Sequence, residues 1–197
     1  LLNELVNQGD MTMKQRNTLL RDMTEDVSEL VLKNNYRQAQ ALNIAETMAR
    51  KSTDDYVRLM RSLQKEGKLD PALEFLPSEK ELLARKEQGL GFTRPELSVL
   101  ICDARIELKQ ALINSWITDD AGFSREMETA FPARLLKDYP DAVRNHRLRR
   151  EITATQIAND LVNRMGITFV HNLHNATGMS YAHIAAAYLV TREVYDI

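Results

Sequence analysis

The segment HRLRR, residues 146–150, places three arginines and one histidine within about one and a half helical turns. A guanidinium group donates paired hydrogen bonds to a carboxylate or a phosphate, so Arg147, Arg149 and Arg150 could bind an acidic protein surface or a nucleic acid. A nucleic-acid-binding helix usually repeats basic residues along one face, and the residues after this turn are mostly apolar or small. We therefore expect these arginines to be a candidate interdomain contact, with Arg147 ion-paired to Glu151 four residues later.

Two histidines and one cysteine could serve as metal ligands. His171 and His174 lie three residues apart, so on a helix both could face one metal ion. No third ligand stands nearby in the sequence, and we expect two partly exposed histidines and no metal site. Cys102 is the only cysteine, which excludes an internal disulfide and a cysteine-based structural zinc site. Its apolar context, VLICDA, predicts a buried and unreactive thiol.

The remaining patterns that could carry chemistry are weak. The acidic pairs at 54–55 and 119–120 point apart on a helix, which is typical of cap and loop residues rather than of an acid–base dyad. Gly89 and Gly91 begin a G-x-G pattern, but Arg94 occupies the third glycine position and no strand precedes it. We expect a helix–loop–helix turn there, with no catalytic residue and no cofactor site in the chain.

Helix-start signals recur along the chain and predict an all-α fold. Capping boxes are expected at Thr12, Ser78 and Thr93, each followed three residues later by Gln or Glu, and Ser180 is expected to cap a final helix. No convincing strand pattern appears. The signals indicate about eight helices, packed as an irregular bundle.

The longest apolar stripe predicts a central buried helix near 146–175. Steps of three and four residues connect Leu148, Ile152, Val162 and Phe169, so we expect these four side chains in the core of one continuous helix. Gly166 lies on this stripe, where it would permit a close helix–helix approach at a cost of about 1 kcal/mol.

Composition narrows the class of protein further. The chain has 197 residues, 44% of them hydrophobic, which is enough for a sizeable core in a single α-helical domain, residues 1–197. Lys and Arg number 26 against 28 Asp and Glu, so the net charge of -2 gives no general attraction to nucleic acid. No apolar run approaches the roughly 20 residues of a membrane span. We expect a cytoplasmic protein without nucleic-acid or membrane partners.

Three longer motifs carry a resemblance to a known family. LDPALEFLPSE at 69–79, GFTRPELSVL at 91–100 and HRLRREITATQIANDLVNRMGITFVHNL at 146–173 resemble the C-terminal helical region of the large bacterial NAD-specific glutamate dehydrogenases. The segments 23–42 and 181–196 are similar as well, in the same order. Pro71 and Phe92 depart mildly from the family pattern and affect no chemistry.

The resemblance implies a role for the chain within a larger enzyme. In this family a catalytic core precedes the helical region and converts L-glutamate, NAD and water to 2-oxoglutarate, ammonia and NADH. No catalytic or NAD-binding residue of that core has a counterpart here. We expect a fragment that supports the upstream catalytic core or the assembly of a homo-oligomer, with residues 1–51 as an extended helical arm leading to the core. The alternative is a free-standing helical module that binds an acidic or nucleic-acid partner through the basic turn at 146–150.

Overall fold

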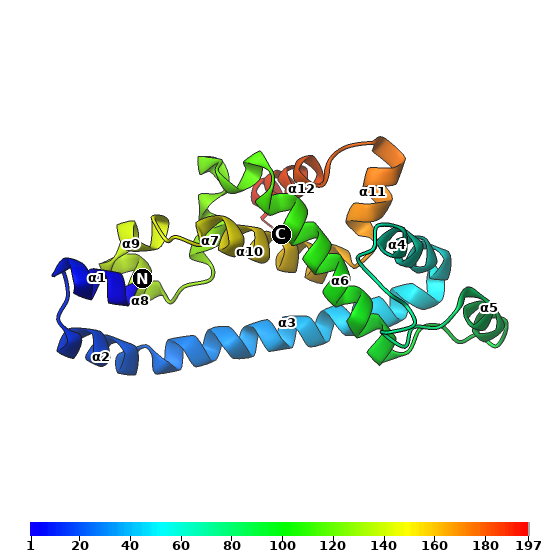
Figure 1. Cartoon of the computed structure of the whole chain (residues 1–197), viewed down its shortest axis with the longest axis horizontal. Helices are drawn as coiled ribbons and strands as arrows, with labels where there is room; N and C mark the ends of the chain where they lie inside the picture. Colours follow the sequence, from blue (N-terminus) through cyan, green and yellow to red (C-terminus); the bar gives the residue numbers. More distant parts are fainter. Residues whose placement is uncertain (197) are drawn as a thin grey trace.

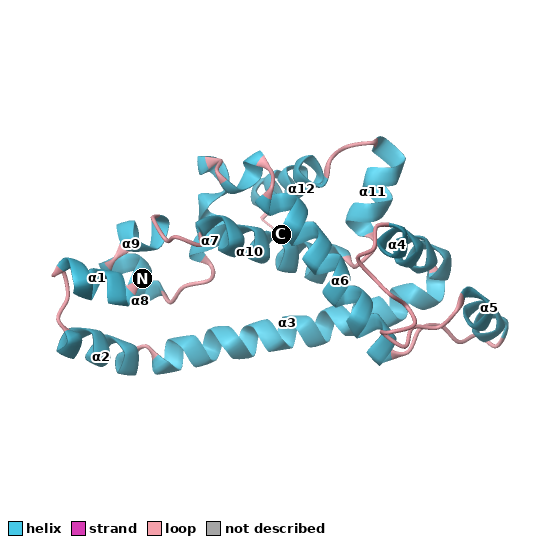
Figure 2. Ribbon diagram, in the orientation of Figure 1, coloured by secondary structure: helices cyan, strands magenta, loops and turns pink. Residues whose placement is uncertain are grey.

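The computed structural model describes residues 1–196, and every regular element in that range is helical (Figure 2). The all-α prediction is therefore confirmed. The described chain contains twelve α-helices rather than about eight, because three short helices lie between residues 124 and 144 and the expected central helix is divided in two. The helices are α1 (Leu2–Gln8), α2 (Met13–Asp22), α3 (Thr24–Lys51), α4 (Thr53–Lys65), α5 (Glu79–Glu87), α6 (Arg94–Ile113), α7 (Ser124–Glu128), α8 (Ala133–Asp138), α9 (Pro140–Arg144), α10 (Arg149–Met165), α11 (Phe169–Thr177) and α12 (Tyr181–Tyr195).

Side-chain caps begin four of these helices where the sequence predicts them. Thr12 and Ser78 form reciprocal capping boxes with the residues three positions on, and Thr93 forms the same box at the start of α6. The Ser180 side chain accepts a hydrogen bond from the His183 backbone N–H at the start of α12. Each cap satisfies backbone donors that the first helical turn leaves without partners, which is why a local four-residue pattern locates these helix starts.

The longest helix, α3, crosses the lower edge of the molecule and connects its two ends (Figure 1). Its buried side chains are Ala41, Ala45 and Ala49, spaced one turn apart in the C-terminal half. Residues 31–40 are all exposed. The helix therefore packs at its C-terminal end against the body of the molecule, whereas its middle spans an open stretch.

The main core lies where α10 packs along α6, with α3, α4, α11 and α12 around them. Ala104 of α6 and Ala154 and Ala158 of α10 are buried, and such small side chains allow two helix backbones to approach closely. Leu97, Leu100 and Leu161 are fully buried on the same faces. Residues of these two helices take part in several charged clusters of the molecule.

The expected continuous helix over 146–175 is wrong in its extent. The chain turns at Gly166, which has φ 91° and ψ 167°, and a new helix begins at Phe169. Only glycine adopts this backbone conformation readily, so the residue interpreted as tolerated inside a helix is the residue that ends it. Val162 is buried as predicted, whereas Leu148 is 44% exposed because it lies just before the first turn of α10. Ile152 and Phe169 are partly buried.

Candidate interdomain contact site

Two of the three arginines of the basic turn form ion pairs within the chain. Arg149 and Arg150 each approach a different oxygen of Asp119, at 2.8 and 2.7 Å. Arg150 also donates to the backbone carbonyl oxygens of Ile113 and Ser115, at 2.7 and 3.2 Å. Ile113 is the last residue of α6 and Ser115 lies just beyond it, where carbonyls have no helical partners, so the guanidinium caps α6 while it anchors the start of α10.

Arg147 behaves differently from the prediction. It is exposed, and within residues 1–196 it forms neither an ion pair with Glu151 nor any side-chain hydrogen bond. The spacing rule fails because α10 begins at Arg149, so Arg147 precedes the helix and does not lie one turn from Glu151. Of the three arginines, Arg147 is therefore the one whose guanidinium is free to reach a surface outside the described chain.

A second hydrophobic cluster, which we call the junction cluster, lies beside this turn. Residues 1–23 contribute Leu5, Met11, Leu19 and Met23, and residues 124–144 contribute Met127, Leu135 and Val143. All seven side chains are at most 9% exposed, and Val143 is fully buried. Arg134 of α8 adds an ion pair with Asp22 of α2 at 3.4 Å. Helices α1 and α2 are thus fixed to α7–α9 across more than a hundred residues of sequence, at the end of the molecule opposite α4 and α5 (Figure 1).

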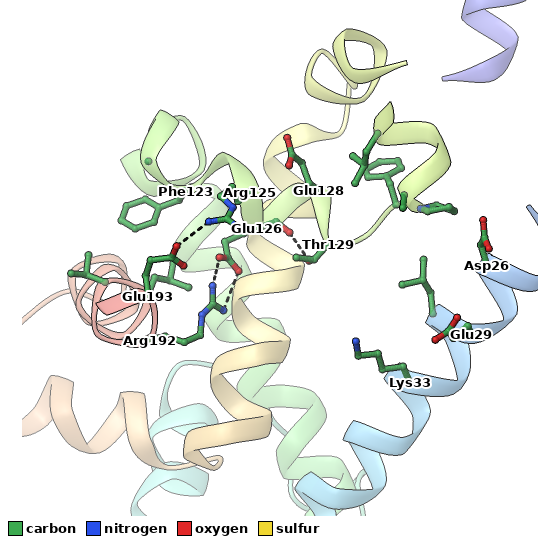
Figure 3. A pocket seen from close by; sticks show the side chains of 18 of the residues that line it. Asp26, Glu29, Lys33, Phe123, Arg125, Glu126, Glu128, Thr129, Arg192 and Glu193 are labelled. Atoms are coloured by element: carbon green, nitrogen blue, oxygen red, sulfur yellow. Dashed lines mark hydrogen bonds and ion pairs between the residues drawn. The ribbon is translucent and has the colours of Figure 1, made fainter. Parts of the chain in front are cut away.

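A cavity of about 730 Å³ separates the N-terminal half of α3 from the body of the molecule (Figure 3). Asp26, Glu29 and Lys33 of α3 form one wall, and residues 122–136 together with the end of α12 form the other. Arg125 and Glu193 form an ion pair of 2.9 Å at its edge, and both side chains are more than two-thirds exposed. The cavity is lined by charges of both signs, which does not select a ligand of one charge.

A partly buried charge network closes the inner side of this cavity. Arg192 of α12 forms an ion pair with Glu126 of α7 and a second one of 2.7 Å with Asp160 of α10. Tyr188 donates to the same Asp160 oxygen at 2.8 Å, and Arg164 pairs with the other oxygen at 3.0 Å. Each charge has a partner of opposite sign. Because the partners lie on α7, α10 and α12, the network joins these three helices.

The pKa values of this network follow from burial and pairing. Burial alone raises the pKa of Asp160, but hydrogen bonds from Tyr188 and Arg192 and the two nearby guanidinium charges outweigh it and lower that pKa below its usual value. Burial, followed by the hydrogen bond to Asp160, raises the pKa of the Tyr188 hydroxyl. Asp160 therefore stays ionised and Tyr188 neutral near pH 7, which suits a structural network rather than proton transfer.

The histidines do not converge on a common point. His171 is buried, and its Nε2 lies 2.9 Å from the side-chain nitrogen of Asn175. The Nδ1 of His174 lies 2.7 Å from the backbone oxygen of Met179. No group of three or more potential metal ligands gathers anywhere in the described part of the chain. His171 is more buried than expected, and this burial lowers the pKa of its imidazole.

Glu107 is a buried carboxylate that the sequence did not single out. Lys68 lies 3.3 Å from its Oε1, and the Tyr181 hydroxyl donates to the same oxygen at 3.2 Å. Burial, then the charge of Glu107, raises the pKa of that hydroxyl. The partners come from positions 39 and 74 residues away in the sequence, so no local pattern could have revealed this cluster.

Cys102 is exposed, which contradicts the prediction of a buried thiol. The neighbouring Ile101 is buried, and one step along an α-helix rotates the side chain by about 100°. An apolar run such as VLICDA therefore does not bury every residue in it, and Cys102 faces outward from α6.

Over residues 1–196 the fold is all-helical, and its charged clusters join helices to one another. None of its helices in that range is long and apolar enough to cross a membrane. The chain matches the family model "Glutamate dehydrogenase, C-terminal" over residues 89–197, and it belongs to this family. Residues 1–45 match a second model, "Bacterial NAD-glutamate dehydrogenase, catalytic domain".

Curated relatives agree with this assignment. The chain is 56% identical over 197 residues to an NAD-specific glutamate dehydrogenase of Pseudomonas aeruginosa, and 49% and 30% identical to proteins of the same name from Halomonas elongata and Mycobacterium tuberculosis. Each alignment covers 100% of this chain and 12% of the relative. The chain thus spans a small part of the length of these relatives. The free-standing binding module is not favoured by these matches, and two of its three arginines are already paired with Asp119.

Proposed function

We propose that the chain is the C-terminal helical part of an NAD-specific glutamate dehydrogenase and that it braces the last helices of the catalytic domain. The whole enzyme would oxidise L-glutamate with NAD and water to 2-oxoglutarate, ammonia and NADH. NAD would bind to the upstream catalytic core, and the present helices would contribute no catalytic group. The family membership and the names of the relatives support this proposal.

The observation that carries the bracing role is the composition of the junction cluster. Leu5, Met11, Leu19 and Met23 lie in the segment that matches the catalytic-domain model, and their partners in α7–α9 lie in the segment that matches the C-terminal family. The two family segments therefore share one hydrophobic core. Separating them would expose these apolar side chains at a cost of about 1.5 to 3 kcal/mol for each large one.

A second attachment holds the other end of α3. Ala45 and Ala49 pack into the main core, and Arg94 of α6 lies 3.0 Å from Glu46 and donates to the Asn43 side chain at 2.8 Å. The segment that matches the catalytic-domain model ends at residue 45, within this contact. A helix anchored at both ends can keep a fixed direction, which is what a hinge between a moving catalytic domain and a static support requires.

Arg147 supplies the proposed contact to the upstream core. Its exposed guanidinium lies beside the junction cluster and lacks an ion-pair partner in residues 1–196, so a carboxylate on the upstream core could satisfy it. We include in the proposal a homo-oligomeric parent enzyme in the cytoplasm. A chain with a single cysteine and no disulfide fits a reducing compartment.

The proposal is tested by weakening the junction cluster in the full-length enzyme. Leu19→Ala is compared with Leu82→Ala, which removes a leucine from α5 at the opposite end of the molecule (Figure 1); the two side chains are 8% and 1% exposed. Each substitution is expected to cost about 2 to 5 kcal/mol in local stability. Glutamate-dependent NADH formation should fall for Leu19→Ala and stay near the wild-type rate for Leu82→Ala. Equal rates in the two variants would refute the bracing role, and absence of glutamate oxidation by the wild-type enzyme would refute the assigned reaction.

A further inference from the structure

A hollow of about 500 Å³ is lined by residues of three helices, α3, α6 and α10. Its volume is within the range of small-molecule binding sites, which runs from about 300 to 1,000 Å³. Apolar side chains such as Leu42, Ile101 and Ala158 form much of its wall. The polar side chains among them determine which ligand the hollow could accept.

The charges that line this hollow are of one sign. Arg105 and Lys109 both contribute to the lining, and no Asp or Glu does so among the described residues. Neither cation forms an ion pair within residues 1–196, although the chain carries more acidic than basic residues overall. A cavity with two cations and no carboxylate has a positive potential and attracts anions.

The Arg105 side chain has unused hydrogen-bonding capacity inside the structure. It donates through one terminal nitrogen to the Asn163 side chain, and its Nε–H is buried without a partner in the described chain. A guanidinium carries five N–H donors, and leaving a buried donor without an acceptor is unfavourable. Burial also lowers the pKa of Arg105, although the group remains a cation near pH 7. An anion at this position would relieve both the unpaired donor and the uncompensated charge.

Neutral donors surround the two cations. Gln38 of α3 and Asn159 of α10 line the hollow, and neither amide forms a side-chain hydrogen bond with residues 1–196. Together with Arg105 and Lys109, they place N–H donors on all three helices around one space. Arginine with amide donors on neighbouring elements is a typical arrangement for holding a carboxylate or a phosphate.

We propose that this hollow binds a small organic anion, with its carboxylate or phosphate group on Arg105 and Lys109 and its uncharged body on the apolar wall. This site is independent of the bracing role proposed above. It lies on the main core rather than at the junction cluster, and it requires no chemical step.

Cys102 provides a direct readout of this site. It is exposed, it lines the same hollow, and it is the only cysteine of the chain. A bound anion would cover the thiol and slow its reaction with an uncharged reagent such as N-ethylmaleimide. The labelling rate of the 197-residue chain is measured by mass spectrometry, with glutarate and inorganic phosphate as probes and with glutaramide as the uncharged analogue of glutarate. Sodium chloride keeps the ionic strength equal in all samples.

We expect glutarate, phosphate or both to slow labelling in a saturable manner, and glutaramide to have no effect. Protection by glutarate alone assigns a carboxylate site, and protection by phosphate alone assigns a phosphate site. Arg105→Gln should lower the affinity for the protecting anion by about tenfold or more, because it removes a charge-assisted hydrogen bond. Arg37→Gln is the matched control, since it removes an exposed charge beside Gln38 that does not line the hollow, and it should leave protection unchanged.

Lys109→Gln gives a second, independent variant, and calorimetric titration of the wild-type chain with the same probes checks binding without the thiol. Circular dichroism verifies that each variant is folded. The proposal is overturned if neither anion slows labelling, if glutaramide protects as well as glutarate, or if folded Arg105→Gln and Lys109→Gln bind the anion as tightly as Arg37→Gln does.

Discussion

Replacing Arg192 by methionine should destabilise the chain strongly, because it removes the cation shared by two carboxylates that are mostly shielded from solvent. The Arg192 side chain is 18% exposed, and those of Glu126 and Asp160 are 10% and 15% exposed. Methionine keeps much of the apolar stem but leaves both acids without this partner. Removing one member of a buried ion pair costs about 3 to 5 kcal/mol. Because both acids keep some contact with solvent, we expect a loss at the lower end of this range, about 3 kcal/mol.

The assay is thermal unfolding of the 197-residue chain, followed by circular dichroism. For a chain of this size 1 kcal/mol corresponds to about 2 to 4 °C, so Tm should fall by about 6 to 12 °C. Arg125→Met is the matched control, since Arg125 pairs with Glu193 at the edge of the same cavity (Figure 3). Its side chain is 77% exposed, so this loss should be only about 0 to 1 kcal/mol.

The pH dependence provides a second check on the same substitution. In the wild-type chain the lowered pKa of Asp160 adds stability above its unfolded value of about 4, and this contribution is lost as pH falls through the folded value. In Arg192→Met, Asp160 loses a hydrogen bond and a nearby positive charge that lower its pKa, so it gains a proton more readily and the difference in Tm between wild type and variant should narrow below about pH 5. The reasoning is refuted if Arg192→Met lowers Tm no more than Arg125→Met does, or if the difference widens in acid.

Three further outcomes are expected. Gly166→Ala should lower the free energy of unfolding by about 1 to 3 kcal/mol, because φ is 91° at this position. Gly91→Ala is the control: its added Cβ would lie at an ordinary 3.6 Å from Arg50, so the free energy of unfolding should change by less than about 1 kcal/mol. Equal losses for the two variants in chemical denaturation would contradict this expectation. Burial lowers the pKa of His171, so its contribution to stability is present above the unfolded pKa of about 6.5 and is lost in acid. In His171→Gln, Tm should therefore fall less steeply between about pH 7 and 5. An unchanged slope would show that His171 does not cause the fall in Tm. Arg147→Glu in the full-length enzyme should reduce activity or alter the oligomer mass without changing the domain's Tm, and normal activity and mass would remove Arg147 from the proposed contact.

Features determined by a few neighbouring residues could be predicted from the sequence. The capping boxes at Thr12, Ser78 and Thr93 depend on side chains three residues apart, and the all-α class depends on their repetition. The paired apolar faces of α6 and α10 also follow from helical spacing. These features need no knowledge of where distant segments meet.

The errors arose where backbone geometry or helix boundaries decide the outcome. Gly166 fits the apolar stripe, but its positive φ ends α10, and a pattern of side chains does not reveal φ. The expected pair of Arg147 with Glu151 assumed a helix that starts two residues later in the structure. Cys102 shares its apolar run with Ile101 but not its helix face.

The charged clusters were inaccessible to sequence reasoning for a different reason. Arg192 meets Glu126 and Asp160 across 66 and 32 residues, and nothing local to any of them indicates the others. The hollow proposed to bind an anion could be predicted from the sequence only in part. Arg105 and Lys109 lie four residues apart on α6, a spacing visible in the sequence, but the donors from α3 and α10 become neighbours only through the tertiary packing.

Hydrogen exchange of α2 in the full-length enzyme tests the bracing role most directly. Val143 is fully buried in the junction cluster and belongs to the C-terminal family segment, whereas α2 belongs to the segment that matches the catalytic-domain model. Val143→Ala should cost on the order of 2 kcal/mol and speed exchange of the α2 amides by about thirtyfold, with α6 unaffected. If α2 exchanges at the wild-type rate in this variant, the C-terminal helices do not hold the end of the catalytic domain.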